Sequence, residues 1–295
     1  MVRVKTNSPL PIVYLNGDFC RLEDASISVL DRGFLFGDGI YEIIPVYRGM
    51  PLQPDRHLAR LSYGLNAISI EDPLGRDGWT SLITDLIARN GEADVAVYLQ
   101  VTRGTPDYRD HAFPAHTKPT AFAMCTPLPE LKPELTEKGI AAITRADNRW
   151  DRCDIKSISL LANVLLRQEA VNAGVAETIL YDGDLIAEGS ASSVFAVIGG
   201  KIITPPDGPE ILPGTTRDLV LDLAAADDLT ARFAEISRTE LANADEIWLA
   251  SSLRELLPVT ELDTRPVGTG KPGPVFCRVY QLYQDHKRRM SERAA

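Results

Sequence analysis

Cysteine and histidine are both scarce in this chain, with four of each among 295 residues. The cysteines lie far apart and form no CxxC pair, which argues against a disulfide framework and against a thiolate zinc site. Reduced cysteines in a cytoplasmic protein are the simpler interpretation. A zinc site on His111 and His116 lacks a third ligand at a suitable spacing, so we expect no bound metal.

Long apolar runs are also missing. No stretch approaches the roughly 18 apolar residues that are needed to span a bilayer. The N-terminal segment 1–11 has no apolar core of the kind found in secretory signals. We therefore expect a cytoplasmic protein with no membrane partner.

Positive charge is in deficit: 31 Lys and Arg residues stand against 41 Asp and Glu, a net charge of −10. A negative surface repels phosphate backbones, so we expect no nucleic-acid partner. The net charge does not exclude a local positive pocket for a small anion. The hydrophobic fraction of 44% is typical of a globular chain, and 295 residues suggest two domains.

The spacing of apolar residues predicts a mixture of helices and short strands. A 3–4 spacing predicts helices over 54–69, 79–88, 157–173, 219–226 and 275–289. Short β-rich runs with turn signals predict strands over 12–16, 40–47, 95–101, 120–125, 140–144, 177–181, 185–188, 193–198, 201–204 and 246–250. Mixed hairpins and helices favour an α/β or α+β fold over a regular βαβ repeat.

Three prolines in residues 126–133 cannot sit inside a helix or a central strand. We interpret this segment as a linker between a small N-terminal domain, 1–125, and a larger domain, 134–295.

Lys156 and Glu188 are candidates for chemistry at the ends of predicted elements. Lys156 lies at a strand-to-helix transition, where partial desolvation would favour Schiff-base chemistry. Glu188 ends a strand and precedes a run of small hydroxyl residues, where a carboxylate could hold a cationic ring nitrogen. Taken alone, a solvated lysine and a plain tight turn are the better interpretations.

Two stretches could bind an anion at the start of a helix. Thr215 and Thr216 follow Gly214 at a predicted helix start, where N–H groups and hydroxyls suit a phosphate. Ser251 and Ser252 follow a strand and precede a stretch that we interpret as helical. An ordinary helix cap explains each stretch equally well.

Two further stretches could face a substrate. Arg109 and His111 lie in the loop after strand 95–101, where an arginine could grip a carboxylate with two parallel hydrogen bonds. Segment 31–42 has three glycines in seven positions, which implies special backbone angles, and Tyr41 would emerge there at a strand start. A solvated polar loop and a core tyrosine are the alternatives.

Five motifs occur together in this order: Asp31-Arg-Gly-x-x-Phe-Gly-Asp-Gly-x-Tyr-Glu, Gln100-Val-Thr-Arg-Gly, Arg149-Trp-x-Arg-Cys-Asp-Ile-Lys-Ser, Glu188-Gly-Ser and Gly214-x-Thr-Arg-Asp. With them the chain resembles the fold-type IV pyridoxal-phosphate enzymes, the class IV aminotransferases, from about residue 12 to 285. The resemblance implies a small N-terminal α/β domain and a larger C-terminal pseudo-barrel domain.

The resemblance also implies roles for the candidate residues, with pyridoxal 5′-phosphate as the cofactor. Lys156 matches the lysine that forms the internal aldimine and moves the proton. Glu188 matches the carboxylate that keeps the ring nitrogen protonated. The remaining cofactor contacts implied by the family, mostly to the phosphate, are Arg60, Ser192, Thr215, Thr216, Ser251 and Ser252.

Among the subgroups of this family, the chain is most similar to the D-amino-acid aminotransferases. Arg109, His111 and Tyr41 match residues that hold the substrate α-carboxylate there, and the Arg-x-His loop comes from the neighbouring subunit. The resemblance therefore implies a homodimer that transfers amino groups between D-amino acids and 2-oxo acids, typically D-alanine and 2-oxoglutarate, in a ping-pong reaction.

Three positions depart from the family pattern, namely Ser193, Thr215 and Pro45, and they bear on specificity more than on cofactor use. A branched-chain L-aminotransferase, an (R)-amine transaminase or an aminodeoxychorismate lyase on the same scaffold remains an alternative. A non-catalytic cofactor-binding protein is the alternative from another class.

Overall fold

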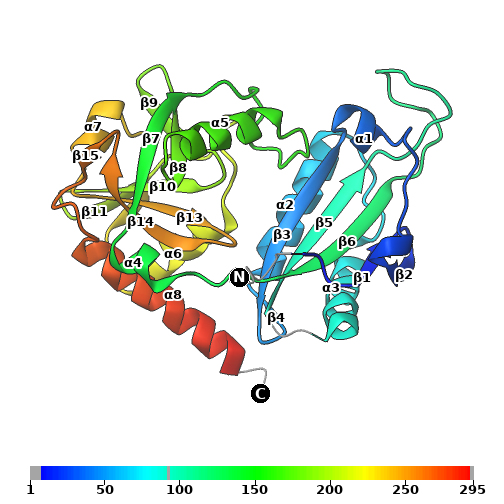
Figure 1. The fold of residues 1–295 in the computed structure, drawn as a ribbon, viewed down its shortest axis with the longest axis horizontal. Helices are drawn as coiled ribbons and strands as arrows, with labels where there is room; N and C mark the ends of the chain where they lie inside the picture. Colours follow the sequence, from blue (N-terminus) through cyan, green and yellow to red (C-terminus); the bar gives the residue numbers. More distant parts are fainter. Residues whose placement is uncertain (1–7, 92–93, 293–295) are drawn as a thin grey trace, which may run out of the picture. The chain divides into compact units, whose positions relative to one another are not determined.

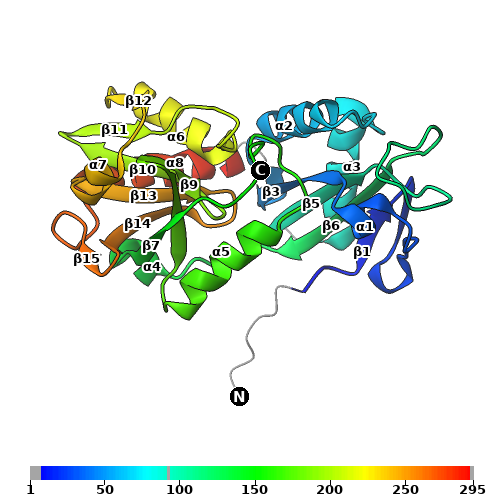
Figure 2. The same ribbon diagram turned by 90° about the horizontal axis from the view of Figure 1, so that it is seen from above.

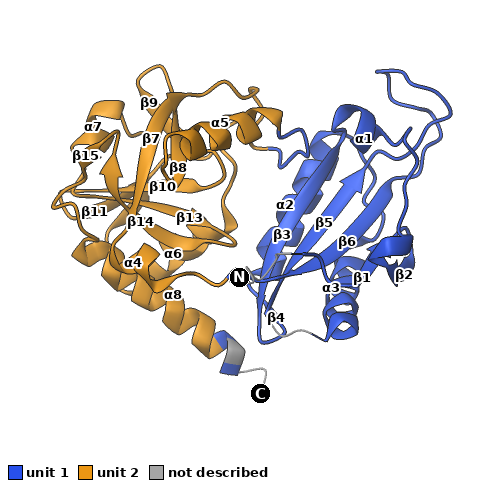
Figure 3. Ribbon diagram, viewed as in Figure 1, with its two compact units in different colours: residues 1–129, 155–160, 290–295 blue, residues 130–154, 161–289 orange. Residues whose placement is uncertain are grey.

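The computed structural model describes residues 8–91 and 94–292 of the chain. These residues divide into two units, shown in Figure 3. Of the described residues, unit 1 comprises 8–91, 94–129, 155–160 and 290–292, and unit 2 comprises 130–154 and 161–289. Residues 155–160, which the sequence prediction placed within 134–295, pack in unit 1.

The described part of unit 1 is built on a six-stranded sheet with the order β2-β1-β6-β5-β3-β4. Its neighbouring strands all pair antiparallel. The elements are β1 (Ile12–Leu15), β2 (Asp18–Arg21), the short 3₁₀ helix η1 (Leu22–Asp24), α1 (Arg32–Phe36), β3 (Gly39–Tyr47), β4 (Met50–Pro51), α2 (Pro54–Ala67), α3 (Gly75–Asn90), β5 (Val95–Thr102) and β6 (Thr120–Pro127).

Helices α2 and α3 cover one face of this sheet, as Figures 1 and 2 show. Leu61 and Leu65 of α2 and Leu86 of α3 are almost fully buried in one core with the apolar residues of β3 and β5. Their 3–4 spacing is the pattern that predicted both helices, so those two predictions are confirmed.

Unit 2 contains a nine-stranded sheet within its described residues. The order is β12-β11-β10-β13-β14-β7-β8-β9, with β15 paired to β14. The elements are α4 (Pro133–Glu137), β7 (Ile140–Ala146), α5 (Leu161–Asn172), β8 (Glu177–Asp182), β9 (Leu185–Gly189), β10 (Ser193–Ile198), β11 (Lys201–Thr204), α6 (Thr215–Ala226), β12 (Ala231–Phe233), α7 (Arg238–Ala242), β13 (Glu246–Ser251), β14 (Glu255–Leu262), β15 (Arg265–Pro266) and α8 (Pro274–Glu292).

Parallel and antiparallel pairs are mixed in this second sheet. β7 pairs parallel with both β14 and β8, whereas β13 pairs antiparallel with both β10 and β14. The chain therefore has the mixed α/β architecture that its sequence predicts, with one sheet in each unit. No helix in residues 8–91 and 94–292 is both long and apolar enough to cross a membrane.

Candidate active site

Lys156 lies in an extended segment beside the first residues of β3. The Tyr41 amide donates to the Lys156 carbonyl oxygen at 3.0 Å, and the Ile158 amide donates to the Gly39 carbonyl oxygen at 3.0 Å. These two bonds hold the backbone on either side of Lys156 against a strand of the unit 1 sheet. The position of the Lys156 side chain is therefore set by long-range backbone pairing.

The helix predicted to begin at Ser157 begins instead at Leu161, so its predicted start is wrong by one turn. An antiparallel bridge between Ile40 and Ser157 takes the chain out of helical geometry at this point. The Ser157 hydroxyl also accepts a hydrogen bond from the Ser159 amide at 3.0 Å. Apolar spacing predicts the helix that follows, but it cannot predict a pairing partner more than 100 residues away in sequence.

Tyr41 lies directly against the Lys156 side chain. The Lys156 Nζ atom is 4.3 Å from the centroid of the Tyr41 ring, a cation–π distance. Tyr98 stacks on Tyr41, with ring centroids 5.7 Å apart, and donates to the Gln100 Oε1 atom at 2.6 Å. Burial, with a smaller contribution from Tyr41, raises the pKa of Tyr98 to about 12, so its hydroxyl stays protonated.

Arg60 is tied to a buried carboxylate on β3. Its Nε atom donates to Glu42 Oε1 at 2.7 Å and its Nη2 atom donates to Glu42 Oε2 at 2.9 Å. The His57 Nδ1 atom lies 2.7 Å from Glu42 Oε2, and it carries the proton because a carboxylate only accepts. Glu42 thereby sets the orientation of the guanidinium group that is a predicted phosphate ligand.

Arg109 and His111 stand on an exposed loop that follows β5. The centroids of the His111 and Phe36 rings are 5.3 Å apart, and the Arg109 guanidinium carbon lies 4.7 Å from the centroid of the Phe36 ring. Among the described residues, neither Arg109 nor His111 makes a hydrogen bond, ion pair or ring contact with Tyr41 or Lys156.

In unit 2, Glu188 is held by an arginine that the sequence analysis gave no role. Arg149 Nη1 donates to Glu188 Oε1 at 2.6 Å, and Arg149 Nη2 donates to Asp147 Oδ2 at 2.7 Å. Burial alone would lower the pKa of Arg149, but Asp147 and Glu188 outweigh it and raise that pKa. Glu188 is itself 5% exposed, so its carboxylate is a rigid acceptor next to a permanent positive charge.

The small hydroxyl residues of unit 2 gather around the ends of three elements. Ser193 begins β10 and pairs with Ala250, which places the Ser192 turn next to Ser251 at the end of β13. A Cβ atom added at Gly214 would lie 2.4 Å from the Ser193 Oγ atom, so the turn touches the start of α6.

Thr215 and Thr216 are buried in the first turn of α6, with Gly214 as the N-cap residue. The first N–H groups of an α-helix have no partner within the helix, so this turn presents donors. The stretch after Ser252 was predicted to be helical, and this is wrong: residues from Glu255 form β14, which pairs back on β13. Ser251 and Ser252 therefore occupy a strand end and turn, not a helix start.

Glu177 anchors the same turn through its carboxylate. Its Oε1 atom accepts a hydrogen bond from the Ser190 hydroxyl, and its Oε2 atom accepts from the Ser192 hydroxyl at 3.3 Å and from Arg254 Nη1 at 3.1 Å. The Glu177 side chain is fully buried. The turn after Glu188 is thus locked to a buried carboxylate by its own serines.

The predicted site residues fall into two sets, each within one unit. Unit 1 brings Lys156, Tyr41 and Arg60 onto or beside β3 and α2, and unit 2 brings the remaining predicted cofactor ligands together. The chemistry of the second set suits pyridoxal phosphate: hydroxyls and helix-start N–H groups suit the phosphate, and a carboxylate suits the protonated ring nitrogen. The residues present fit that cofactor.

Sequence reasoning missed several residues that hold this arrangement in place, among them Glu42, His57, Arg149 and Glu177. Glu42 and Arg149 both stand inside motifs that were singled out, so a charged residue within a β-rich or motif segment was the available signal. The role of His57 depends on a bond between α2 and β3 that no local pattern contains.

Comparison with known proteins identifies the family. The model of the family "Amino-transferase class IV" matches residues 39–262. D-alanine aminotransferase of Bacillus licheniformis is 37% identical over 274 residues, which cover 92% of this chain and 96% of that protein. D-alanine aminotransferase of Staphylococcus aureus is 37% identical over 276 residues, covering 93% and 97%.

Solved structures support the same family assignment. The branched-chain aminotransferase of Escherichia coli superposes with a TM-score of 0.87 at 26% identity and 94% coverage of both chains. A second branched-chain aminotransferase, solved with pyridoxamine 5′-phosphate, gives a TM-score of 0.87 at 25% identity, again with 94% coverage of both. The chain therefore belongs to the class IV aminotransferase family, whose members depend on pyridoxal phosphate.

Proposed function

We propose that this enzyme transfers the amino group of D-alanine to 2-oxo acids such as 2-oxoglutarate. The observation that carries the proposal is the pairing of a Lys156–Tyr41 contact with a separate Arg109-x-His111 loop in a family member. Relatives that are 37% identical over more than nine-tenths of both chains carry the name D-alanine aminotransferase. An arginine is the side chain best suited to bind a substrate carboxylate with two parallel bonds.

Each group of this chain has a part in that reaction. Pyridoxal phosphate, when bound, supplies an electron sink for the negative charge that develops at the substrate α-carbon. The Lys156 Nζ atom takes the α-proton and returns it, acting as general base and then as general acid. When the cofactor is bound, Glu188 would keep its ring nitrogen protonated, and the turn that carries Ser192 would lie beside it. The phosphate ligands would be Arg60, Thr215, Thr216, Ser251 and Ser252.

Adding D-alanine to the holoenzyme should bleach the visible absorbance of the bound cofactor, and L-leucine should not. The reason is that the substrate carboxylate and the Lys156 amine must lie in a fixed relation to the α-hydrogen, which only one configuration at the α-carbon satisfies, and L-leucine has the opposite configuration to D-alanine. The measurement is an absorbance titration with each amino acid in the absence of a 2-oxo acid. Bleaching by L-leucine alone would favour a branched-chain enzyme, the second candidate, to which the solved structures also point.

We further propose a homodimer in which the Arg109 loop of one subunit serves the site of the other. Helix α5 supports this with an apolar stripe on its outer face: Leu161, Val164, Leu165 and Val171 are 51–73% exposed. A stripe of exposed aliphatic side chains at helical spacing is typical of a contact surface. All four cysteines are unpaired, which supports our placing of the enzyme in the reducing cytoplasm.

Leu165→Glu should convert the dimer to a monomer, because a charge placed in an apolar contact is left without a partner. A monomer would lose the Arg109 loop that the other subunit supplies, and with it the hydrogen bonds to the substrate carboxylate. Activity with D-alanine should therefore fall by about tenfold or more, because a hydrogen bond to a charged group contributes about 1.5–3 kcal/mol. Light scattering coupled to size exclusion measures the mass, which is 32.3 kDa for one chain.

Ser81→Glu is the matched control for this variant. It places the same carboxylate at an exposed position of α3, outside the apolar stripe of α5, and should keep the dimer mass and the activity. A Leu165→Glu protein that stays dimeric and fully active would show that α5 is not the contact surface.

A further inference from the structure

We infer that Arg32 is a positioning residue for substrate binding: it holds the loop that carries Arg109 and His111 by binding three consecutive backbone carbonyls of that loop. The inference rests on the proposed function, in which this loop binds the substrate α-carboxylate. Neither the motifs nor the family resemblance assigned Arg32 a role.

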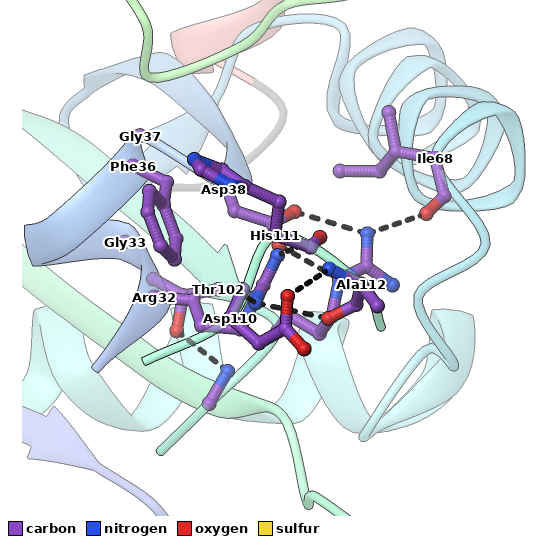
Figure 4. A network of polar contacts seen from close by, with 12 residues as sticks. Arg32, Gly33, Phe36, Gly37, Asp38, Ile68, Thr102, Asp110, His111 and Ala112 are labelled. Carbon is purple, nitrogen blue, oxygen red and sulfur yellow. Dashed lines mark hydrogen bonds and ion pairs between the residues drawn. The ribbon is translucent and has the colours of Figure 1, made fainter. Parts of the chain in front are cut away.

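The Arg32 side chain directs most of its donors to the loop (Figure 4). Its Nη1 atom donates to the Asp110 carbonyl oxygen at 2.5 Å and to the Ala112 carbonyl oxygen at 3.3 Å. Its Nη2 atom donates to the His111 carbonyl oxygen at 3.1 Å. A planar guanidinium with donors in a rigid fork can bind three neighbouring carbonyls at once, which a lysine ammonium cannot do in one plane.

The Arg32 guanidinium is itself held by the carboxylate of Asp38. Its Nε atom donates to Asp38 Oδ2 at 2.7 Å, and Arg103 donates to both oxygens of the same carboxylate at 2.8 and 3.0 Å. Burial raises the pKa of Asp38, but its bonds and charge pairs with Arg103 and Arg32 outweigh this and lower it. Asp38 therefore anchors Arg32, which is only 4% exposed.

Phe36, on the same helix as Arg32, contacts the side chains that the loop presents. Its ring lies 4.8 Å from the Arg32 guanidinium carbon and 4.7 Å from that of Arg109, and the His111 ring centroid is 5.3 Å away. Arg32 thus orients the loop backbone, and Phe36 orients the two side chains. Helix α1 acts as a platform for the Arg-x-His pair.

Beyond its contacts with Arg32 and Phe36, the loop is held by Arg103, whose guanidinium carbon lies 3.6 Å from the centroid of the Phe113 ring. Residues 103–119, all of them described, contain neither helix nor strand, and the side chains of 107–113 are exposed. Side chains that bind a substrate lose much of their effect when they move by about 1 Å, so the anchor of such a loop affects binding directly.

Arg32→Lys should raise the KM for D-alanine by about 10- to 100-fold and leave kcat within about threefold. The lysine keeps the positive charge beside Asp38 but loses the fork that binds the carbonyls. Cofactor content, measured by absorbance, should equal that of the wild type. Arg76→Lys is the matched control, since the Arg76 side chain pairs with Asp55 at the exposed surface, and it should change neither parameter.

A double-mutant cycle with Arg109→Leu tests whether Arg32 acts through Arg109. In the Arg109→Leu background, Arg32→Lys should change the KM for D-alanine by less than about twofold, because the side chain it positions is already gone. Additive effects, or an unchanged KM in Arg32→Lys alone, would overturn the inference and leave the proposed function standing. An unchanged KM in Arg109→Leu would instead overturn the proposed carboxylate site, and the inference with it.

If Arg32→Lys fails to fold, as judged by circular dichroism, Arg32→Gln carries the same cycle. It removes the fork that binds the three carbonyls and leaves Asp38 paired with Arg103. Non-additivity with Arg109→Leu supports the positioning role of Arg32, and additivity overturns it.

Discussion

Lys156→Ala should lower kcat with D-alanine by about 10³-fold or more, since positioned general acid–base catalysis contributes about 10²–10⁴-fold. The Nζ atom that lies 4.3 Å from the Tyr41 ring is removed, and alanine offers no group to take the α-proton. The backbone bonds of Lys156 to β3 involve main-chain atoms only, so they survive the substitution. The loss should therefore appear in kcat while the fold is kept.

Lys156→Arg is the control for charge. It keeps a cation over Tyr41, but a guanidinium is not deprotonated in proteins and cannot serve as a base. Both variants should have thermal midpoints near that of the wild type and should both be inactive in steady-state assays. A Lys156→Ala protein that completes many turnovers would contradict the proposed role.

The sequence predicted the elements whose signal is local. Helices α2 and α3 follow from apolar spacing, and the hairpin strands from β-rich runs ended by glycine turns. The family followed from five motifs in one order. These features depend on residues close together in the chain.

The sequence could not predict features that depend on distant pairing. The residues that follow Lys156 are not helical because β3 binds the backbone there, and the stretch after Ser252 becomes a strand because β13 offers an edge. Local propensity gives way in both places to a tertiary hydrogen-bond partner. The ion pairs Glu42–Arg60 and Arg149–Glu188 could not be predicted for the same reason: each joins two segments of the chain that only the fold brings into contact.

The Glu42 cluster is expected to be the most sensitive polar site of unit 1. Glu42→Gln should lower the free energy of unfolding by about 3–5 kcal/mol, because it leaves the guanidinium of Arg60 without its carboxylate in a buried setting. The Glu42 side chain is fully buried and that of Arg60 is 7% exposed. Calorimetry should show a thermal midpoint lower by roughly 10 °C.

Asp55→Asn provides the matched control, because it also removes one carboxylate from an arginine pair in unit 1. Asp55 and its partner Arg76 are 75% and 67% exposed, so water screens the pair. The expected loss is below about 1 kcal/mol. A similar loss in both variants would show that the burial of Glu42 does not matter.

The pH dependence of stability distinguishes the contribution of the Glu42 charge from the contribution of its packing. Burial would raise the pKa of Glu42, but the charge and hydrogen bonds of Arg60, with that of His57, lower it to about 2. A carboxyl with a lowered folded-state pKa stabilises the fold above its unfolded value, and this contribution, roughly 3 kcal/mol, is lost as the pH falls toward 2.

His57 acts in the same direction as Glu42. Its pKa is lowered, chiefly by burial, so the unfolded chain binds its proton more readily below about pH 6.5. The wild type should therefore lose stability on acidification over both windows. Glu42→Gln has no carboxyl to protonate at this position, so the gap in unfolding free energy between the two proteins should narrow steadily from pH 5 to pH 3. A gap that stays constant across that range would mean that the cost of Glu42→Gln comes from packing and not from the buried charge.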